Sequence, residues 1–429
     1  MGRKSQTTKL HLYLQGNLVG EYVKTPDGAT SFSYDRTWIS EGFAISQSLP
    51  LITTPYKGDV VRAYFDNLLP DLKEIRESIA AKVNAESSDH FDLLSAIGHD
   101  CVGALLFTNS EENSQTKDKA PTGITLSHQD IAAMIKNLKS RPLGMSSGVE
   151  DLRISLAGVQ EKTALLYWDD KWHRPTGITP TTHIFKPAMK FETHGLDMRT
   201  SVHNEYFCMK LCQAFGLRVA DVDIKDFDGE LILVVERFDR LLKDGIIYRK
   251  AQEDMCQALG YFSTKKYQSD NGPGVKEIVS ILETSVKAKE DLETFFKSLV
   301  VFYILGAIDG HAKNYSIEYA KEGYFLAPLY DILSIFPALN QKEIGVGKYK
   351  MALGMGKSNH YTAKRINRRH FIETAKFCRI TQARANEIID EVLVCVKNEV
   401  WNKINYSKNF EHKIKEKIVD GIKIIAGGL

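Results

Sequence analysis

The sequence predicts an α+β protein with a mixed N-terminal lobe, which includes an extra β-rich subdomain, and a largely helical C-terminal lobe. Residues 8 to 35 alternate between apolar and polar side chains, which is typical of half-buried strands. From Gln252 onward the apolar residues recur mostly at helical spacing, which predicts helices over 253–259, 274–283, 291–305, 369–378, 381–400 and 408–425. A mixed sheet followed by a run of helices indicates the α+β class.

The composition is that of a soluble globular protein. The chain has 429 residues, 43% of them hydrophobic and 26% charged, which is long enough for two or three domains. No run of about 18 apolar residues indicates a membrane span. The first residues lead directly into a strand pattern, without a secretory signal. The six cysteines are scattered without CxxC spacing. We therefore expect free thiols, a cytoplasmic location and no membrane partner.

The first part of the chain is predicted to combine a small antiparallel sheet with helices. Alternating runs flank turns at residues 16–17 and 25–28. Helical spacing begins at Asp59, and the sequence predicts further helices over 72–83, 89–97 and 127–138, a strand over 102–108, and exposed or linking segments over 110–121 and 141–148. We divide the chain into four segments: 1–110, 111–150 (helix and linker), 151–240 and 241–429.

A strand, a loop of small residues and a second strand open the third segment. The predicted strands cover 152–155 and 163–168, and the loop 156–162 contains one glycine, Gly158. Backbone N–H groups in such a loop can approach a phosphate. An ordinary hairpin turn explains the same pattern, so both interpretations stay open here.

A lysine and a glutamate follow at positions where they could meet. Lys186 ends an apolar strand that begins at Thr181, and Glu205 lies near the start of an amphipathic helix that ends at Gly216. The lysine could direct its charge at phosphates, or it could be an edge lysine. The glutamate could pair with Lys186, or it could favour the positive end of the helix dipole.

Two strands, 219–224 and 231–236, are predicted around a turn at 226–229. The second strand runs into a linker near Glu236 and Phe238. In a kinase, the hinge that offers backbone groups to adenine is a strand-to-linker passage of this kind.

The strongest chemical pattern follows the apolar segment 295–305. Asp309 precedes Asn314 by five positions, and Asp331 comes after a predicted hairpin over 315–327. This spacing is that of a kinase catalytic loop and its metal site. One carboxylate would orient the acceptor hydroxyl, and an amide and a second carboxylate would supply hard oxygen ligands for magnesium. The alternative is a polar turn that caps a helix.

Several motifs together resemble the HipA family of bacterial serine/threonine kinases, the toxins of toxin–antitoxin modules. The resemblance covers nearly the whole chain, because residues 8 to 110 look like the N-terminal subdomain of the family. The motifs lie at Ile154–Ala164, Gly177–Lys186, Val235–Asp239, Gln252–Cys256, Asp309–Asn314 and Tyr330–Asp331.

The resemblance implies a two-lobed protein-kinase-like fold that uses ATP and magnesium. By matching residues, Asp309 would be the catalytic carboxylate, Asn314 and Asp331 would hold the metal, and Ser155 would be autophosphorylated. Glu205 would form a supporting ion pair. The nucleotide would be bound by Ala157, Gly158, Val159, Gln160, Glu161, Lys162, Lys186, Glu236, Phe238, His311, Lys313, Asn314 and Asp331.

The resemblance also implies partners. They are a helix-turn-helix antitoxin dimer of the HipB type, operator DNA bound mainly through that antitoxin, and a protein substrate such as glutamyl-tRNA synthetase. The alternatives are a kinase of another protein, a small-molecule kinase with similar spacing, and a non-catalytic subunit of a DNA-binding repressor. The last is motivated by residues 341–429, which carry 18 Lys and Arg against 9 Asp and Glu. A solvated helical surface explains that charge equally.

Overall fold

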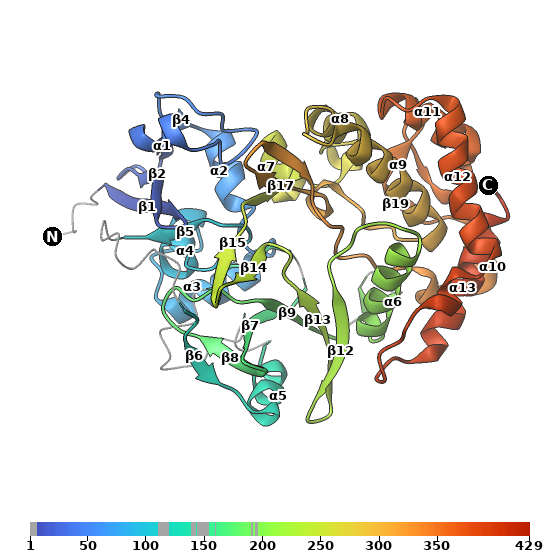
Figure 1. Ribbon diagram of the computed structural model, residues 1–429, viewed down its shortest axis with the longest axis horizontal. Coiled ribbons are helices and arrows are strands. Elements are labelled where there is room, and N and C mark those ends of the chain that lie inside the picture. Colours follow the sequence, from blue (N-terminus) through green and yellow to red (C-terminus); the bar gives the residue numbers. More distant parts are fainter. Residues whose placement is uncertain are drawn as a thin grey trace. The chain divides into compact units, whose positions relative to one another are not determined.

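The structure is a computed structural model of the chain (Figure 1). It describes residues 7–109, 120–138, 143, 154–158, 160–189, 192–193 and 196–429. The chain forms two compact units. Unit 1 comprises Met1–Phe185 and Arg237–Thr264, and unit 2 comprises Lys186–Glu236 and Lys265–Leu429. The four-segment division stays a prediction, and its linker over 141–148 lies almost wholly outside the described residues. No helix in the described part is long and apolar enough to cross a membrane.

Unit 1 begins with a five-stranded antiparallel sheet in the order β4-β3-β2-β1-β5 (Figure 1). The β1–β2 turn has positive φ at Gln15 and Gly16, as tight hairpins require. The last strand is shorter than the predicted 102–108, because the backbone of Cys101 and Gly103 bonds to arginine and aspartate side chains instead. The strands are β1 (Thr8–Leu14), β2 (Asn17–Lys24), β3 (Thr30–Tyr34), β4 (Tyr56–Lys57) and β5 (Leu106–Thr108).

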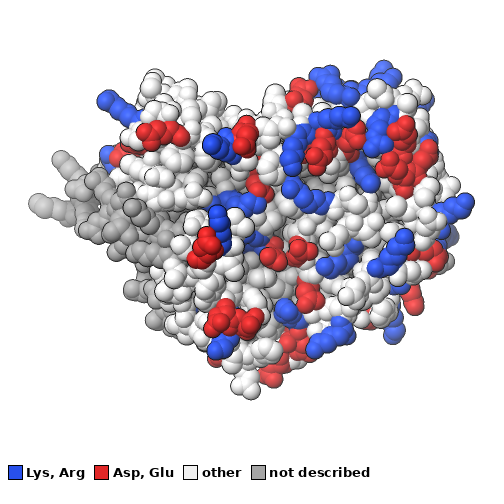
Figure 2. Space-filling model, in the orientation of Figure 1, with Lys and Arg blue, Asp and Glu red and all other residues white. Residues whose placement is uncertain are grey.

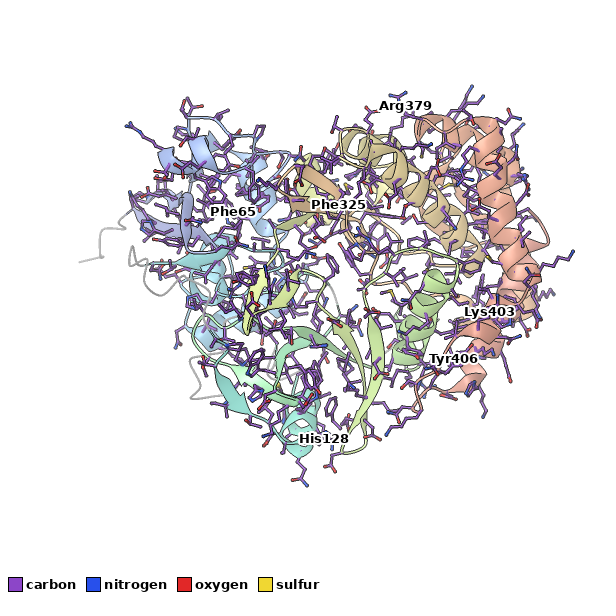
Figure 3. The ribbon with its side chains drawn as sticks, viewed as in Figure 1. Phe65, His128, Phe325, Arg379, Lys403 and Tyr406 are labelled. Atoms are coloured by element: carbon purple, nitrogen blue, oxygen red, sulfur yellow. The ribbon has the colours of Figure 1, made fainter. Side chains whose placement is uncertain are left out.

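Helices α1 to α5 lie in unit 1 together with these strands. Phe65 of the second helix, labelled in Figure 3, stacks on Tyr22 of β2 with ring centroids 4.0 Å apart, and both side chains belong to the hydrophobic core. Asp35 caps the first helix, which the sequence analysis did not anticipate. The helices are α1 (Arg36–Glu41), α2 (Asp59–Asp66), α3 (Lys73–Val83), α4 (His90–Ile97) and α5 (His128–Lys136).

The rest of unit 1 carries the predicted phosphate loop. The strand before it is not formed in its described part, since Ile154 makes only an isolated bridge to Asp100. Thr163 of β7 pairs instead with Phe185 of β9. The elements are β6 (Gly123–Thr125), β7 (Thr163–Trp168), β8 (Lys171–Pro175), β9 (His183–Pro187), β14 (Arg240–Lys243), β15 (Ile246–Arg249), β16 (Gln252–Asp254) and α7 (Met255–Leu259).

Unit 2 holds the predicted catalytic motif. The hairpin between β12 and β13 turns at Asp228 and Gly229, both with positive φ. The long helix α9 ends at Leu305, and Gly306 follows in the left-handed conformation (φ 61°) that terminates helices. The elements up to the predicted hairpin are β10 (Glu192–Thr193), β11 (Leu196–Asp197), α6 (Ser201–Ala214), β12 (Val222–Phe227), β13 (Glu230–Glu236), α8 (Val275–Leu282), α9 (Ala288–Leu305), β17 (Ser316–Ala320) and β18 (Gly323–Leu326).

The C-terminal part of unit 2 contains one helix, α10, and one hairpin that the sequence analysis did not anticipate, and its last helix starts later than expected. The structure has a hairpin, β19–β20, where no strand was expected. The last helix begins at His412 rather than Lys408, because Phe410 stacks on Tyr406 and Asn409 bonds to the backbone of Ile224. The elements are α10 (Gln341–Val346), β19 (Lys350–Met355), β20 (His360–Thr362), α11 (Arg368–Phe377), α12 (Gln382–Lys397) and α13 (His412–Ala426). Short 3-10 helices are η3 (Ser263–Lys265), η4 (Gln268–Asp270), η5 (Ala312–Asn314), η6 (Phe336–Ala338), η7 (Ala363–Arg365) and η8 (Val400–Lys403).

Candidate active site

Two hydrogen bonds to the backbone carbonyl of Asp309 hold the loop between α9 and β17. The backbone oxygen of Asp309 accepts hydrogen bonds from the His311 N–H (2.8 Å) and from the Asn314 side-chain Nδ2 (2.8 Å). Residues Ala312–Asn314 then form one turn of 3-10 helix before the strand begins. The Asp-x4-Asn spacing therefore makes a compact loop in which the amide of Asn314 holds the backbone of Asp309.

The carboxylate of Asp309 has a tyrosine partner. The side chain is 52% exposed. The Tyr267 hydroxyl donates a hydrogen bond to Asp309 Oδ1 at 2.5 Å. The sequence analysis missed Tyr267, which lies 42 positions earlier in a segment without regular periodicity.

His311 contacts Tyr267, the partner of Asp309. Its ring packs edge-on against the Tyr267 ring, with centroids 4.9 Å apart. Burial lowers the pKa of His311, although the nearby carboxylate of Asp309 opposes that shift, so the imidazole is neutral at pH 7. Its Nδ1 is buried and has no hydrogen-bond partner among the described residues. An orphaned buried nitrogen of this kind is available to a ligand.

Lys186 bridges two carboxylates in the same unit. Its Nζ lies 2.7 Å from Glu205 Oε1 and 2.7 Å from Asp331 Oδ1. Lys186 and Glu205 are both buried, whereas the Asp331 side chain is about one-third exposed. Burial by itself would lower the pKa of Lys186, but the two carboxylates outweigh it and raise the pKa, so the lysine is charged.

Two oxygen groups of unit 2 have the chemistry of a magnesium site. Asn314 uses its Nδ2 on the Asp309 carbonyl, which leaves its side-chain oxygen without a partner among the described residues. Asp331 offers a carboxylate from a residue with φ of 60°, a left-handed conformation that is costly for residues other than glycine and is often found at functional sites. No group of three or more His, Cys, Asp or Glu suited to a metal occurs in the described part. One carboxylate and one amide fit Mg²⁺, which takes its other ligands from phosphates and water.

Ser155 and its loop lie in unit 1. The Ser155 side chain is fully buried, and its hydroxyl donates to the Leu68 carbonyl at 2.6 Å. Its backbone N–H donates to the Asp100 carbonyl at 3.0 Å. Gly158 forms a parallel bridge with Pro70, and Lys162 Nζ donates to the Ala157 carbonyl at 2.6 Å. Gln160 and Glu161 are half-buried, and Val159 lies outside the described residues.

The two predicted hinge residues fall on either side of the boundary between the units. The Glu236 N–H donates to the Asp221 carbonyl at 2.8 Å, so this N–H already has a protein partner. The Phe238 carbonyl accepts a hydrogen bond from Lys250 Nζ at 3.2 Å. The adenine role of both residues stays a prediction. Lys313, the remaining predicted nucleotide ligand, is buried in the loop between α9 and β17 of unit 2.

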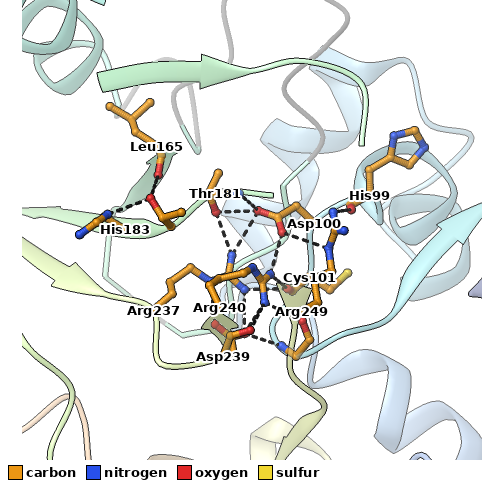
Figure 4. Close-up of polar contacts among 12 residues, drawn as sticks. His99, Asp100, Cys101, Leu165, Thr181, His183, Arg237, Asp239, Arg240 and Arg249 are labelled. Carbon is orange, nitrogen blue, oxygen red and sulfur yellow. Dashed lines mark hydrogen bonds and ion pairs between the residues drawn. The ribbon is translucent and has the colours of Figure 1, made fainter. Parts of the chain in front are cut away.

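A buried charge cluster follows the hinge in unit 1 (Figure 4). Asp100 accepts hydrogen bonds from Arg237 (3.2 Å) and Arg240 (2.7 Å) and lies 3.9 Å from Arg249. Asp239 pairs with the first two arginines. Burial opposes ionisation, but the arginines outweigh it and hold the pKa of both carboxyls below the usual value. Since the Asp100 carbonyl also binds Ser155, the cluster anchors the segment that holds the loop.

Several basic residues of the C-terminal region pair with acidic residues. Arg384 bonds to three glutamates, and Arg368 and Arg379 each bond to one acidic side chain. Figure 2 shows Lys and Arg intermixed with Asp and Glu over the C-terminal helices. This arrangement is typical of a solvated helical surface.

Comparisons with known proteins cover both parts of the chain. A model of the HipA N-terminal domain matches residues 10–108, and a model of the HipA-like C-terminal domain matches residues 154–400. "Putative kinase Y4mE" of Sinorhizobium fredii is 33% identical, over 81% of this chain and 81% of its own length. "Serine/threonine-protein kinase toxin HipA" of Shewanella oneidensis is 29% identical, over 77% of this chain and 76% of its own length.

A solved structure matches over nearly the whole chain. HipA of Shewanella oneidensis, solved with HipB and its operator DNA, superposes with a TM-score of 0.76 at 22% identity, over 97% of this chain and 96% of that one. The match confirms the predicted fold class. The chain therefore belongs to the HipA family of serine/threonine-protein kinase toxins.

Proposed function

We propose that this kinase transfers the γ-phosphoryl group of ATP, with magnesium, to serine hydroxyls of a translation protein and to its own Ser155. The observation that carries the proposal is the set of Asp309, Asn314, Lys186 and Asp331 in one unit, with the lysine charged and one oxygen of Asn314 left for a ligand. A polar turn that only caps a helix has no need of such a set.

Each residue has a distinct part in this reaction. Asp309 orients the acceptor hydroxyl and takes its proton. Lys186 directs its positive charge at the nucleotide phosphates, with Glu205 holding it in place. The neutral imidazole of His311, with its orphaned Nδ1, contributes a hydrogen bond to the nucleotide. Asn314 and Asp331 would hold the metal, which would supply positive charge to neutralise the phosphates.

Phosphorylation of Ser155 would switch the kinase off. The hydroxyl is fully buried against the Leu68 carbonyl, an acceptor that cannot satisfy a phosphate. A phosphate brings about −1.5 to −2 charges at neutral pH, and burial of that charge without a cationic partner is costly. The segment must therefore leave this position to be phosphorylated, and the modified segment cannot return. The loop would then no longer cover the nucleotide.

The partners proposed for this chain are those of the relative. The Shewanella structure contains HipB and operator DNA. We propose a HipB-type helix-turn-helix antitoxin dimer as partner, with repression of the shared operon by the complex. We propose glutamyl-tRNA synthetase as the target and the cytoplasm as the place of action.

One experiment tests the proposal. Wild type and Asp309→Gln are incubated with labelled ATP and magnesium, with and without glutamyl-tRNA synthetase, and the sites are mapped by mass spectrometry. We expect phosphate on Ser155 and on the synthetase for wild type, and a rate about 10²–10⁴ lower for the variant. Absence of any turnover by wild type would favour a non-catalytic repressor subunit. Self-labelling without labelling of the synthetase would overturn that target and retain the kinase.

A further inference from the structure

Tyr267 contacts Asp309 from outside the catalytic loop. It lies between η3 and η4, and its hydroxyl donates to Asp309 Oδ1 at 2.5 Å. Its ring packs against His311 with an interplanar angle of 84°. The tyrosine and the loop belong to the same unit. A hydroxyl within hydrogen-bond distance of a catalytic carboxylate is expected to affect its reaction.

The segment that carries Tyr267 is held in place on both sides. The Ala312 N–H of the catalytic loop donates to the Lys266 carbonyl at 3.3 Å. The Gly272 N–H donates to the Tyr267 carbonyl at 3.0 Å. The side-chain oxygen of Gln268 accepts a hydrogen bond from the Gly354 N–H at 2.7 Å. Bonds to the catalytic loop and to β19 therefore fix the tyrosine, so its hydroxyl has a defined position.

The carboxylate of Asp309 needs an external restraint. Its side chain is half-exposed, and the bonds from Asn314 and His311 reach only its backbone oxygen. Rotation of an aspartate carboxylate about its last torsion is loosely restricted. Oδ1 is taken by Tyr267, whereas Oδ2 has no hydrogen-bond partner in the described part of the chain. The tyrosine thus leaves one defined oxygen for an incoming hydroxyl.

We propose that Tyr267 is a positioning residue for phosphoryl transfer, which holds Asp309 Oδ1 so that Oδ2 faces the acceptor hydroxyl. The inference rests on the proposed function. As the acceptor oxygen bonds to the γ-phosphorus, its proton passes to Oδ2, the bond from the γ-phosphorus to the bridging oxygen breaks, and ADP leaves with that electron pair. Tyr267 keeps its own proton throughout. Misplacement of a reacting group by about 1 Å can cost 10²-fold in rate.

The test uses Tyr267→Phe in the full chain, which removes the hydroxyl and retains the ring against His311. We expect kcat for Ser155 labelling to fall about 10- to 100-fold, as for loss of a hydrogen bond to a charged group, with KM for ATP and the melting temperature unchanged. Tyr406→Phe is the matched control (Figure 3). It removes a tyrosine hydroxyl that donates to the Trp401 carbonyl at 2.6 Å in the same unit, and kcat should stay unchanged.

A second measurement, in a variant that lacks the Asp309 carboxylate, distinguishes a positioning role of Tyr267 from any other role. In Asp309→Asn, addition of Tyr267→Phe should cause no further loss of the residual labelling, because the tyrosine acts only through the carboxylate. If Tyr267→Phe lowers the labelling rate by the same factor in the wild-type and Asp309→Asn chains, the proposal is overturned. An unchanged kcat of Tyr267→Phe in the otherwise wild-type chain would also overturn it. A raised kcat would mean that the hydroxyl blocks the base instead. If Asp309→Asn alone retains full activity, the proposed function fails and this inference fails with it, whereas an inactive Asp309→Asn beside a fully active Tyr267→Phe overturns this inference alone.

Discussion

The substitution Glu205→Gln should change the magnesium requirement of the kinase. In the structure Lys186 forms ion pairs with both Glu205 and Asp331, and each carboxylate oxygen lies 2.7 Å from its Nζ. Glutamine keeps the shape and a hydrogen-bond acceptor but removes one negative charge. The lysine should then bind Asp331 more strongly, in competition with the metal that Asp331 is proposed to hold.

The expected size follows from the two kinds of hydrogen bond. A bond between Lys186 and a carboxylate contributes about 1.5–3 kcal/mol, whereas one to a neutral amide contributes about 0.5–1.5 kcal/mol. The difference of about 1–2 kcal/mol favours the pairing of Lys186 with Asp331. At 1.36 kcal/mol for each factor of ten, the magnesium concentration for half-maximal activity should rise about 5- to 30-fold.

The assay is the initial rate of Ser155 labelling at saturating ATP over a range of magnesium concentrations. Glu391→Gln serves as the control, because Glu391 forms an exposed ion pair with Arg384 at 2.9 Å on the surface of the same unit, and its loss should change nothing. An unchanged magnesium midpoint in Glu205→Gln, with normal folding, would refute the shared-charge reasoning.

Two further predictions concern the metal ligands and the buried cluster. Asp331→Ala should abolish the magnesium dependence of nucleotide binding, and Asn314→Ala should weaken it less, as measured by nucleotide titration with and without the metal. Unaltered metal dependence in Asp331→Ala would contradict its role. Asp100→Asn should lower the free energy of unfolding by about 3–5 kcal/mol in denaturant titration, because it leaves buried arginines underpaired. The pKa of Asp100 is lowered by folding, so its stabilising effect is present above about pH 4 and is lost as the pH falls below that value. A constant difference between wild type and Asp100→Asn from pH 7 to pH 3 would contradict this.

Local patterns predicted most of the secondary structure around Asp309. The apolar helix that ends at Leu305, the loop from Asp309 to Asn314 and the hairpin before Asp331 are all encoded by neighbouring residues. The predicted helix over 127–138 is likewise confirmed as α5, whose start is marked by a capping box of Ser127 and Asp130. The errors lie where distant contacts override local preference. Residues from Lys408 have helical character, but bonds to Ile224 and packing on Tyr406 hold them outside the helix.

The sequence by itself determined the α+β class, the family and the loop structure from Asp309 to Asn314. These depend on periodicity and on motifs whose residues are close in the chain. Only the tertiary structure decided which side chains meet Lys186, Asp309 and Asp100. Asp331 reaches Lys186 from 145 positions away, and Arg237 reaches Asp100 from 137. Tyr267 likewise could be identified only from the tertiary structure, because a single tyrosine is part of no sequence motif. Folding brings its hydroxyl to the carboxylate of Asp309, 42 positions later in the chain.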